Sequence, residues 1–290
     1  MIKKGIILAG GTGSRMSPVT KAVNKQLLPL YDKPLFYYPL SVLMLAKIKE
    51  VLIIVNKGQI DQFKKVLPNG NNLGIRVTYA EQNKPRGLPD AFIVGEKFIG
   101  NSPTALILGD NFFFGQSLTK KLISAAKLTK GAKIFLHPVK NPQLYGIAQV
   151  NKKNKIINIV EKPKKTKFNL AVTGLYFFDN KVVKLSKLLK PSKRKETEIV
   201  DLLNKYKVKQ QLSAEIIGRG GAWLDAGSIK DFNNTSNFVA SIENRQGFKI
   251  GCVEEIAFNN KWINKTQIKK AIKFYGNCEY SKYLSLIINK

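Results

Sequence analysis

The fold is decided by the stretch Ile6-Ile7-Leu8-Ala9-Gly10-Gly11-Thr12-Gly13-Ser14-Arg15-Met16. An apolar run typical of a buried strand leads into a turn with three glycines within four positions, and a basic residue follows closely. Glycines let a backbone approach a ligand closely and leave main-chain N–H groups able to face an anion. Arg15 and, further along, Lys21 and Lys25 add positive charge. The pattern predicts a phosphate-binding turn at the end of a first strand, with a plain strand–turn–helix link as the alternative.

Two familiar phosphate-binding loops do not fit this turn. The dinucleotide fingerprint G-x-G-x-x-G, started at Gly11, needs a third glycine where Met16 stands. The P-loop needs Gly-Lys-Ser/Thr, whereas the chain has Gly13-Ser14-Arg15. What remains is the pattern L-A-G-G-x-G-x-R-x-x-P-x-T-K, which is far more specific than a glycine pair because so many positions are fixed.

The composition is that of a globular protein. The chain has 290 residues, 44% of them hydrophobic, which suits one large α/β domain or one with a smaller appendage. It has no run of about 18 apolar residues and no signal-peptide layout, so we expect neither a membrane span nor export. Cys252 and Cys278 are too few for a disulfide framework or a zinc site and predict reduced thiols in a cytoplasm. His137 is the only histidine, which leaves a histidine-based triad or metal site almost no material.

The formal net charge of +30 is the one anomaly of the composition. Nucleic acid or an anionic membrane would be the functional interpretation. Against it, only six of the 49 basic residues are arginines, and the lysines are scattered rather than interleaved with aromatic residues. We therefore favour a solvated basic surface, with no specific nucleic-acid or membrane partner, whose field attracts triphosphates.

Hydrophobic periodicity in the first half alternates between strands and helices. Short aliphatic or β-branched runs predict strands at Ile6–Leu8, Val51–Val55, Val77–Tyr79 and Ala105–Leu108, and helical spacing predicts helices at Tyr37–Lys47, Gln59–Leu67 and Asp90–Phe98. Such alternation predicts an α/β fold with a Rossmann-like, mostly parallel mixed sheet and helices on both faces. Ligands of such sheets bind beyond the carboxyl ends of the strands, where the glycine-rich turn would lie.

The second half adds antiparallel and helical features. Gly146–Val150 and Ile156–Val160 flank a polar turn and predict a hairpin, and from Ile229 onward the pattern is mostly helical, apart from a possible second hairpin at Lys249–Ala257. Further strands are expected at Lys133–Val139, Thr173–Phe178 and Leu212–Ile217, and further helices at Lys120–Lys127, at Lys181–Leu189 and up to about Tyr206. We expect a core domain over residues 1–228 and a helical subregion of the same domain over 229–290.

Two acidic residues far apart in the chain are candidate metal ligands. Asp110 follows the strand that ends at Leu108, and Asp225 lies in the tight aromatic and glycine context Trp223–Gly227. An aspartate after a strand often only caps a turn, and taken alone the two interpretations of Asp110 are about even. Mg²⁺ is usually bound by one or two carboxylates together with substrate phosphate oxygens. We therefore expect Asp110 and Asp225 to meet at one Mg²⁺ site.

A second set of residues could form a sugar-phosphate pocket. In Glu161-Lys162-Pro163, the glutamate could bind sugar hydroxyls and the lysine a phosphate, and Tyr145-Gly146 could line the same pocket. By composition alone, a solvated turn in a lysine-rich segment is the more common interpretation, and the residues themselves leave both open.

Several of these motifs together resemble one family. Along nearly its whole length the chain is similar to the glucose-1-phosphate thymidylyltransferases, a branch of the sugar nucleotidyltransferases. The matching segments include Leu8–Arg15, Thr20–Val23, Lys25–Pro29, Tyr31–Pro34, Tyr37–Ser41, Leu108–Asn111, Glu161–Pro163, Ala171–Tyr176, Gly218–Gly220, Ala222–Asp225 and Glu254–Phe258. The run Lys25-Gln26-Leu27-Leu28-Pro29 points to the thymidylyl branch, because related enzymes carry Pro-Lys-Pro there.

The resemblance implies a Mg²⁺-dependent reaction in which glucose 1-phosphate attacks the α-phosphorus of dTTP and pyrophosphate leaves. It implies a nucleotide-binding half at about 1–130 and a sugar-binding part, with hairpin insertions, at about 131–228. The implied catalytic residues are Arg15, Lys25, Asp110, Lys162 and Asp225, of which Asp110 and Asp225 would hold the metal. The implied nucleotide-binding residues are Leu8, Gly10, Gly11, Thr12, Gly13, Ser14, Arg15, Gln26, Gln82, Gly87 and Asp110. The implied sugar-phosphate residues are Tyr145, Gly146, Glu161, Lys162, Val172, Arg194 and Trp223.

The loop that would face the base departs from the family pattern. Arg86 stands where an acidic residue is usual, Pro89 where alanine is usual and Asp90 where glutamine is usual. The alternative of UTP, or another sugar 1-phosphate, with the same chemistry therefore stays open. A catalytically silent sugar-nucleotide sensor and a basic nucleic-acid-binding protein are more remote alternatives.

The resemblance also implies an assembly and its regulation. The family forms homotetramers and uses a second nucleotide site for feedback, for which dTDP-rhamnose is the expected ligand. Gly115, Arg219, Glu255 and Ile256 match residues near that site. Ordinary interface packing is the alternative role of these residues.

Overall fold

The glycine-rich turn follows strand β1 (Lys4–Leu8), the centre of the parallel part of the main sheet in the computed structural model, which describes residues 1–152, 154–192 and 195–289. Ile6 and Ile7 are both fully buried and belong to separate hydrophobic clusters, one on each face of the sheet. A strand buried on both faces reads as a continuous apolar run, which is the pattern of this stretch.

The parallel part of the sheet brings several strand ends to one edge. β1 pairs in parallel with β4 (Glu50–Asn56) and β6 (Thr104–Leu108), and β4 pairs in parallel with β5 (Arg76–Gln82). Leu8 lies opposite Leu108 in the ladder, and the Gly109 amide donates to the Leu8 carbonyl at 2.9 Å. The glycine-rich turn and the Gly109–Asp110 step therefore leave the sheet side by side.

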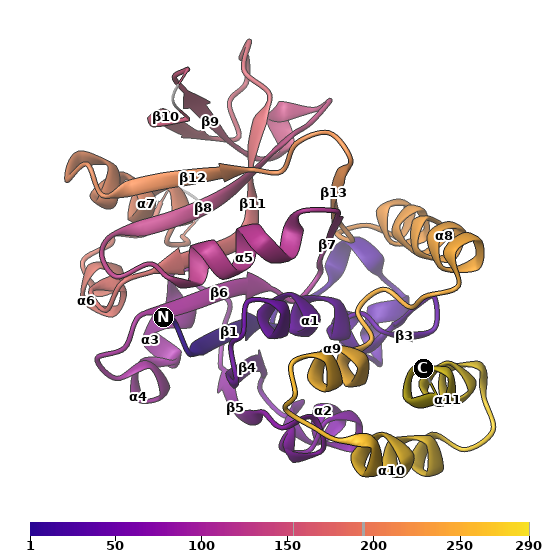
Figure 1. The fold of residues 1–290 in the computed structure, drawn as a ribbon. Helices are drawn as coiled ribbons and strands as arrows, with labels where there is room; N and C mark the ends of the chain where they lie inside the picture. Colours follow the sequence, from indigo (N-terminus) through magenta and orange to yellow (C-terminus); the bar gives the residue numbers. More distant parts are fainter. Residues whose placement is uncertain (153, 193–194, 290) are drawn as a thin grey trace.

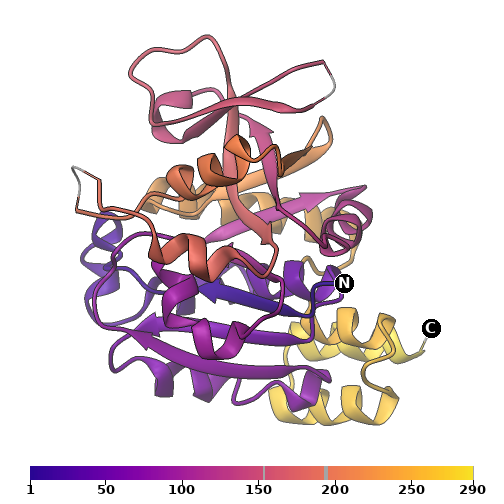
Figure 2. The same cartoon turned by 90° about the vertical axis from the view of Figure 1, so that its left-hand side faces the viewer.

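The other part of the sheet is mainly antiparallel and stands over the parallel part in Figure 2. β11 (Leu170–Phe178) pairs antiparallel with β6, β8 (Ala132–Pro138) and β9 (Gly146–Val150). β9 and β10 (Ile156–Glu161) form the predicted antiparallel hairpin, and β12 (Leu212–Ile216) adds to β8 in parallel.

Two small ladders complete the strands of the described residues. β7 (Asn111–Gly115) pairs with β13 (Gly221–Asp225), and β2 (Pro29–Leu30) pairs with β3 (Lys33–Pro34). Neither ladder is evident in the sequence pattern, because each strand is short and lacks alternation.

Helices cover both faces of the sheet, as predicted (Figure 1). One cluster packs α1, α5 and α9 against the sheet, and the other packs α3, α6 and α7. The bounds are α1 Tyr37–Leu45, α2 Ile60–Val66, α3 Asp90–Val94, α4 Glu96–Ile99, α5 Leu118–Ala126, α6 Val182–Lys187, α7 Ile199–Val208, α8 Ile229–Gln246, α9 Val253–Asn259, α10 Lys265–Tyr275 and α11 Glu279–Asn289. The α/β fold class is thus confirmed. The predicted helix Asp90–Phe98 is interrupted at Gly95, between α3 and α4.

The C-terminal part is helical, and the hairpin expected at Lys249–Ala257 is wrong. Val253 and Ala257, one helical turn apart, are both fully buried in α9, which packs against α1. Tertiary packing thus selects the helical spacing over the β-branched character of the segment. Helices α8 to α11 gather at one side of the molecule, beside α1 and the β2–β3 hairpin (Figure 1). No helix in the described residues is long and apolar enough to cross a membrane.

Candidate functional site

The glycine-rich turn is held by the end of the neighbouring strand β4. The Gly11 N–H donates to Asn56 Oδ1 at 2.9 Å, and Asn56 Nδ2 donates to the Gly11 carbonyl at 2.7 Å. Gly11 and Gly13 have φ of 115° and 60°, in the region that favours glycine. The turn runs into short 3-10 turns, starting with Ser14–Met16, rather than into an α-helix. Anion binding here would therefore depend on the turn and nearby side chains, without a helix dipole.

Gln82 lies directly against this turn. It is buried at the end of β5, and a Cβ added to Gly10 would lie 1.8 Å from Gln82 Nε2. Gly10 is therefore required for the close approach of the glutamine. The predicted nucleotide residues Leu8, Thr12 and Ser14 belong to the same strand end and turn.

Lys25 and Asp110 form an ion pair at the carboxyl edge of the sheet, in which Lys25 is buried and Asp110 is partly exposed. Lys25 starts the 3-10 turn η3 (Lys25–Leu27), which Asn24 caps by accepting from the Gln26 N–H at 2.8 Å. Gln26 in turn packs on Gly109, where a Cβ would lie 2.9 Å from its Cγ. Burial alone would raise the pKa of Asp110, but the Lys25 ammonium holds it below its usual value.

Asp225 reaches this edge through the β13–β7 ladder. It lies opposite Asn111, and the Ala226 N–H donates to the Asp110 carbonyl at 3.1 Å. Burial and the nearby charge of Asp110 raise the pKa of Asp225 to about 6, although Lys25 and Arg15 oppose the shift. The structure therefore brings together the two carboxylates that the sequence predicted to meet.

The carboxylate pair fits the donor set of Mg²⁺. The described residues hold no group of three or more histidine, cysteine or acidic side chains that could bind a metal. Mg²⁺ commonly takes only one or two protein carboxylates and completes its octahedron with water and phosphate oxygens. Burial, and to a lesser extent the charge of Asp110, raises the pKa of Asp225, and a bound divalent cation would favour its ionised form.

Arg15 lies beside Asp225. A Cβ added to Gly227 would lie 2.9 Å from Arg15 Nη2 and 3.0 Å from Asp225 Oδ1, so both groups border the same glycine. Arg15 is solvent-exposed, and its guanidinium can therefore meet a phosphate that arrives from solvent.

Asn111 joins the two halves of the site, and the sequence analysis did not assign it a role. Its side chain is 2% exposed. Its Oδ1 accepts from the Gly174 N–H at 3.0 Å and from Trp223 Nε1 at 2.6 Å, while its Nδ2 donates to Asp110 Oδ1 at 3.0 Å. The sequence did hold one indication of this role. Asn111 directly follows the candidate metal ligand Asp110, and a side-chain amide in that position can fix the orientation of the carboxylate.

The predicted sugar-phosphate residues surround a cavity of about 200 Å³ beside the carboxylates. The Glu161 carboxylate packs against Gly146, because a Cβ added to Gly146 would lie 3.1 Å from Glu161 Oε2. The Lys162 N–H donates to the Tyr145 carbonyl at 3.0 Å, and the Tyr145 ring packs edge-on against Trp223. The cavity is lined by Arg15, Asp110, Tyr145, Gly146, Glu161, Lys162, Val172, Trp223 and Asp225 among the predicted residues, and by Leu88, Asn111, Leu144, Ile199 and Val200, among others, that were not predicted.

Two further predicted residues are Gly87 and Arg194. Gly87 packs against the Thr197 loop, since a Cβ there would lie 2.0 Å from the Thr197 carbonyl oxygen, and the Thr197 N–H donates to the Arg86 carbonyl at 2.7 Å. Gly87 thus joins the loop that contains Arg86, Pro89 and Asp90 to the sugar side of the site. Arg194 lies outside the described residues.

The four residues of the expected feedback site lie in two places. Gly115 and Arg219 line a second cavity, of about 150 Å³, together with Lys121. Glu255 and Ile256 belong to α9, where Glu255 Oε2 accepts from the Tyr283 hydroxyl at 2.8 Å and Ile256 packs on the core.

Comparison with known proteins links this geometry to one family. The family model described as "Nucleotidyl transferase" matches residues 4–242. A glucose-1-phosphate thymidylyltransferase of Neisseria meningitidis serogroup A is 46% identical over 287 residues, covering 99% of this chain and 100% of the relative. One of Xanthomonas campestris is 44% identical over 288 residues, covering 99% and 98%.

Solved structures agree with the sequence relatives. A structure described as a candidate glucose-1-phosphate thymidylyltransferase from Bacillus anthracis, in complex with a sucrose, has a TM-score of 0.75 and 38% identity, covering 81% of this chain and 94% of that one. A UDP-glucose pyrophosphorylase complexed with UDP-glucose has a TM-score of 0.73 and 26% identity, covering 83% and 100%.

Proposed function

We propose that the chain transfers a thymidylyl group from dTTP to glucose 1-phosphate, releasing pyrophosphate and dTDP-glucose. It belongs to the nucleotidyl transferase family, and its relatives place it with the glucose-1-phosphate thymidylyltransferases. One observation carries the proposal. Asp110 and Asp225, with Arg15 beside them, face the same cavity as Lys162 and Glu161, so groups for a triphosphate and for a sugar phosphate converge on one space.

The reaction needs positioning and charge neutralisation rather than a protein nucleophile. A phosphate oxygen of the sugar attacks the α-phosphorus in line, the bond to the β-phosphate breaks, and pyrophosphate carries away the electron pair. Lys162 would hold the attacking phosphate, while Arg15 and Lys25 would neutralise the triphosphate and the leaving group. Burial strengthens the interaction of Lys25, because its side chain is only 8% exposed.

We propose that Asp110 and Asp225 hold Mg²⁺, which would neutralise phosphate charge and orient the α-phosphate. Asn111 fixes Asp110 through its Nδ2 donor, and Lys25 fixes the other carboxylate oxygen. On the sugar side, Tyr145, Gly146, Glu161, Val172 and Trp223 would select the hexose, with Arg194 as a further candidate.

Gln82 is the proposed reader of the base, with Gln26 near the deoxyribose and Gly87 beside the base. The position of Gln82 against Gly10 supports this assignment. UTP as substrate is the second candidate, because a UDP-glucose pyrophosphorylase shares the fold at a TM-score of 0.73 and because Arg86 departs from the thymidylyl pattern.

An assay of pyrophosphate release separates these candidates. The enzyme is supplied with dTTP or UTP, and with glucose 1-phosphate or another hexose 1-phosphate, in the presence of Mg²⁺. We expect the highest kcat/KM for dTTP with glucose 1-phosphate. Equal or higher turnover with UTP would overturn the thymidylyl assignment, and no turnover with any pair would favour a silent sensor.

We also propose a cytoplasmic homotetramer that supplies dTDP-rhamnose or related deoxysugar synthesis and is inhibited by dTDP-rhamnose at Gly115, Arg219, Glu255 and Ile256. The two cysteines are free thiols, which supports a reducing compartment. Size-exclusion chromatography with light scattering tests the assembly. Arg219→Ala tests the feedback, since it should weaken inhibition without lowering the uninhibited rate.

A further inference from the structure

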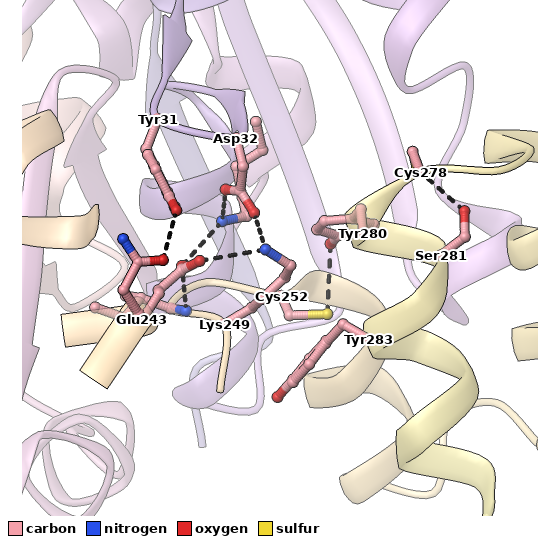
Figure 3. A network of polar contacts seen from close by, with 12 residues as sticks. Tyr31, Asp32, Glu243, Lys249, Cys252, Cys278, Tyr280, Ser281 and Tyr283 are labelled. Atoms are coloured by element: carbon pink, nitrogen blue, oxygen red, sulfur yellow. Dashed lines mark hydrogen bonds and ion pairs between the residues drawn. The ribbon is translucent and has the colours of Figure 1, made fainter. Parts of the chain in front are cut away.

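The motif Tyr31-Asp32-Lys33-Pro34 forms the tip and return strand of the β2–β3 hairpin, and none of its residues lines the proposed active-site cavity. It nevertheless carries two charged side chains that contact the C-terminal part of the chain. Asp32 points toward Lys249 (Figure 3), and Lys33 pairs with Glu243 of α8. Tyr31 has a φ of 62°, an uncommon conformation for a bulky residue. A hairpin tip with this geometry needs contacts that hold it.

Those contacts are two acids and two lysines, here called the charge quartet: Asp32, Lys33, Glu243 and Lys249. Asp32 pairs with Lys33 through one carboxylate oxygen and with Lys249 through the other. Glu243 lies 3.4 Å from Lys33 and 3.3 Å from Lys249. The side chains of Lys33 and Glu243 are only 2% and 4% exposed. Each charge therefore has two opposite partners, as a buried charge requires.

The quartet fastens the hairpin to the C-terminal part of the chain. Glu243 is near the end of α8, and its Oε1 also accepts from the Ile250 N–H at 2.7 Å. The Tyr31 hydroxyl donates to Asn244 Oδ1 at 3.0 Å, and the Tyr280 ring of α11 lies 5.9 Å from Lys33 Nζ and 5.8 Å from Lys249 Nζ. Figure 3 shows Tyr31 and Asp32 of the hairpin facing Glu243 of α8 and Lys249, with Tyr280 of α11 beside Lys249.

The other end of the hairpin is bonded to the turn that carries Lys25. Directly after β3, the Leu35 N–H donates to the Leu28 carbonyl at 3.0 Å and the Phe36 N–H donates to the Gln26 carbonyl at 3.0 Å. Gln26 follows Lys25, which pairs with Asp110. A continuous set of main-chain hydrogen bonds and ion pairs thus runs from Glu243 to the proposed metal ligand.

We propose that the charge quartet positions Lys25 for catalysis, so that Glu243 of α8 and its neighbours on α11 help to set the rate although they do not line the active-site cavity. Asp32, Lys33, Glu243 and Lys249 are then positioning residues for the proposed transfer reaction, on which this inference rests. A displaced hairpin would shift η3 and move the Lys25 ammonium away from the triphosphate. Misplacement by about 1 Å can lower a rate by roughly 100-fold.

A double-mutant cycle tests the inference. The kcat of four proteins is measured at saturating dTTP and glucose 1-phosphate: the native enzyme, Asp32→Asn, Lys25→Met and the double variant. If the quartet acts through Lys25, Asp32→Asn should lower kcat by about 10-fold in the native background and by less than about twofold when Lys25 is absent. The KM for glucose 1-phosphate should change little.

A purely structural role gives a different result. Partial unfolding removes the same fraction of active enzyme in both backgrounds, so an equal loss with and without Lys25 would overturn the inference. Unchanged kcat in Asp32→Asn would overturn it as well, while dTTP turnover by the native enzyme would still support the proposed function. Lys249→Met, which removes the partner of the other Asp32 carboxylate oxygen, repeats the cycle if Asp32→Asn does not fold.

Glu215→Gln is the matched control. Glu215 forms an ion pair with Lys121, with both side chains partly buried, between β12 and α5. Its loss should leave kcat within about twofold of the native value, because this pair has no hydrogen-bonded path to η3 among the described contacts.

Discussion

Asp225 lies across the β13–β7 ladder from Asn111, the residue that follows Asp110 in the sequence, so the ladder holds the second acidic residue close to the first. The same ladder places Trp223 where its indole N–H reaches Asn111 Oδ1. One short ladder therefore fixes the carboxylate pair and one wall of the sugar cavity together.

Asp110→Asn should lower kcat by several orders of magnitude while the protein stays folded. The change removes one candidate metal ligand and the ion-pair partner of the buried Lys25. Pyrophosphate release measures the loss, and circular dichroism checks the fold. Near-native turnover would remove Asp110 from the metal site.

Mg²⁺ binding should weaken as the pH falls through about 6. The pKa of Asp225 is about 6 in the metal-free site, and Mg²⁺ requires the ionised carboxylate, so protons compete with the metal below that pH. We expect affinity to fall by roughly tenfold per pH unit below 6 and to level off above 7. Isothermal titration with MgCl₂ at pH 5, 6 and 7.5 measures this. Equal affinity at pH 5 and pH 7.5 would contradict the assignment of Asp225 as a ligand.

Asp225→Asn should stabilise the metal-free protein at pH 7.5. The folded pKa of about 6 lies above the unfolded value near 3.8, so the favourable contribution of the neutral acid is complete below pH 3.8 and is lost as the pH rises through 6. Above that pH the native protein carries a crowded negative charge, which the amide removes. We expect a gain on the order of 1–3 kcal/mol in unfolding free energy with EDTA present, shrinking toward pH 4.

Denaturant melts of Asp225→Asn at both pH values provide the measurement. Asp201→Asn, at an exposed site on α7, is the control and should change stability by less than about 0.5 kcal/mol. The same stability for native protein and Asp225→Asn at pH 7.5 would show that the carboxylate pair carries no such cost.

Gly10→Ala should damage nucleotide binding more than folding. The new Cβ would overlap Gln82 Nε2, at 1.8 Å, and would drive the glutamine side chain away from the turn. We expect kcat/KM for dTTP to fall by about tenfold or more, with partial loss of discrimination between dTTP and UTP. Gly218→Ala is the control, because a Cβ there meets nothing within 4 Å. Unchanged dTTP kinetics in Gly10→Ala would separate Gln82 from base recognition.

Asn111→Ala should destabilise the protein by about 2–4 kcal/mol. It leaves the Gly174 N–H and the Trp223 indole N–H buried without their acceptor. Because Trp223 lines the cavity, the KM for glucose 1-phosphate should rise as well. Urea melts and steady-state kinetics measure both effects. An unchanged urea midpoint would mean that water replaces the missing acceptor.

The sequence predicted the parallel edge of the sheet well, because its information is local. The apolar runs around Ile7, Ile53 and Ile107 are long enough to identify buried strands, and parallel pairing then brings their ends together. The glycines and Asp110 follow those strands directly. Their position at one edge therefore needed no knowledge of the rest of the fold.

Longer-range features were beyond such reasoning. Nothing near Asn111 indicates that its partner strand lies more than a hundred residues further along, and the β7 and β13 strands are too short to show alternation. The segment Val253–Asn259 is helical because the core selects Val253 and Ala257, a choice that only tertiary packing makes. The pairing of Lys33 with Glu243 likewise becomes visible only once α8 is in place.

The long sequence separation between β7 and β13 also affects the order in which the chain can fold during synthesis. A chain that leaves the ribosome can fold its parallel strands once β6 has emerged, but it holds only Asp110 of the carboxylate pair until residue 225 has followed. Nascent chains and fragments that end before β13 therefore cannot assemble the proposed metal site, however well their first strands fold.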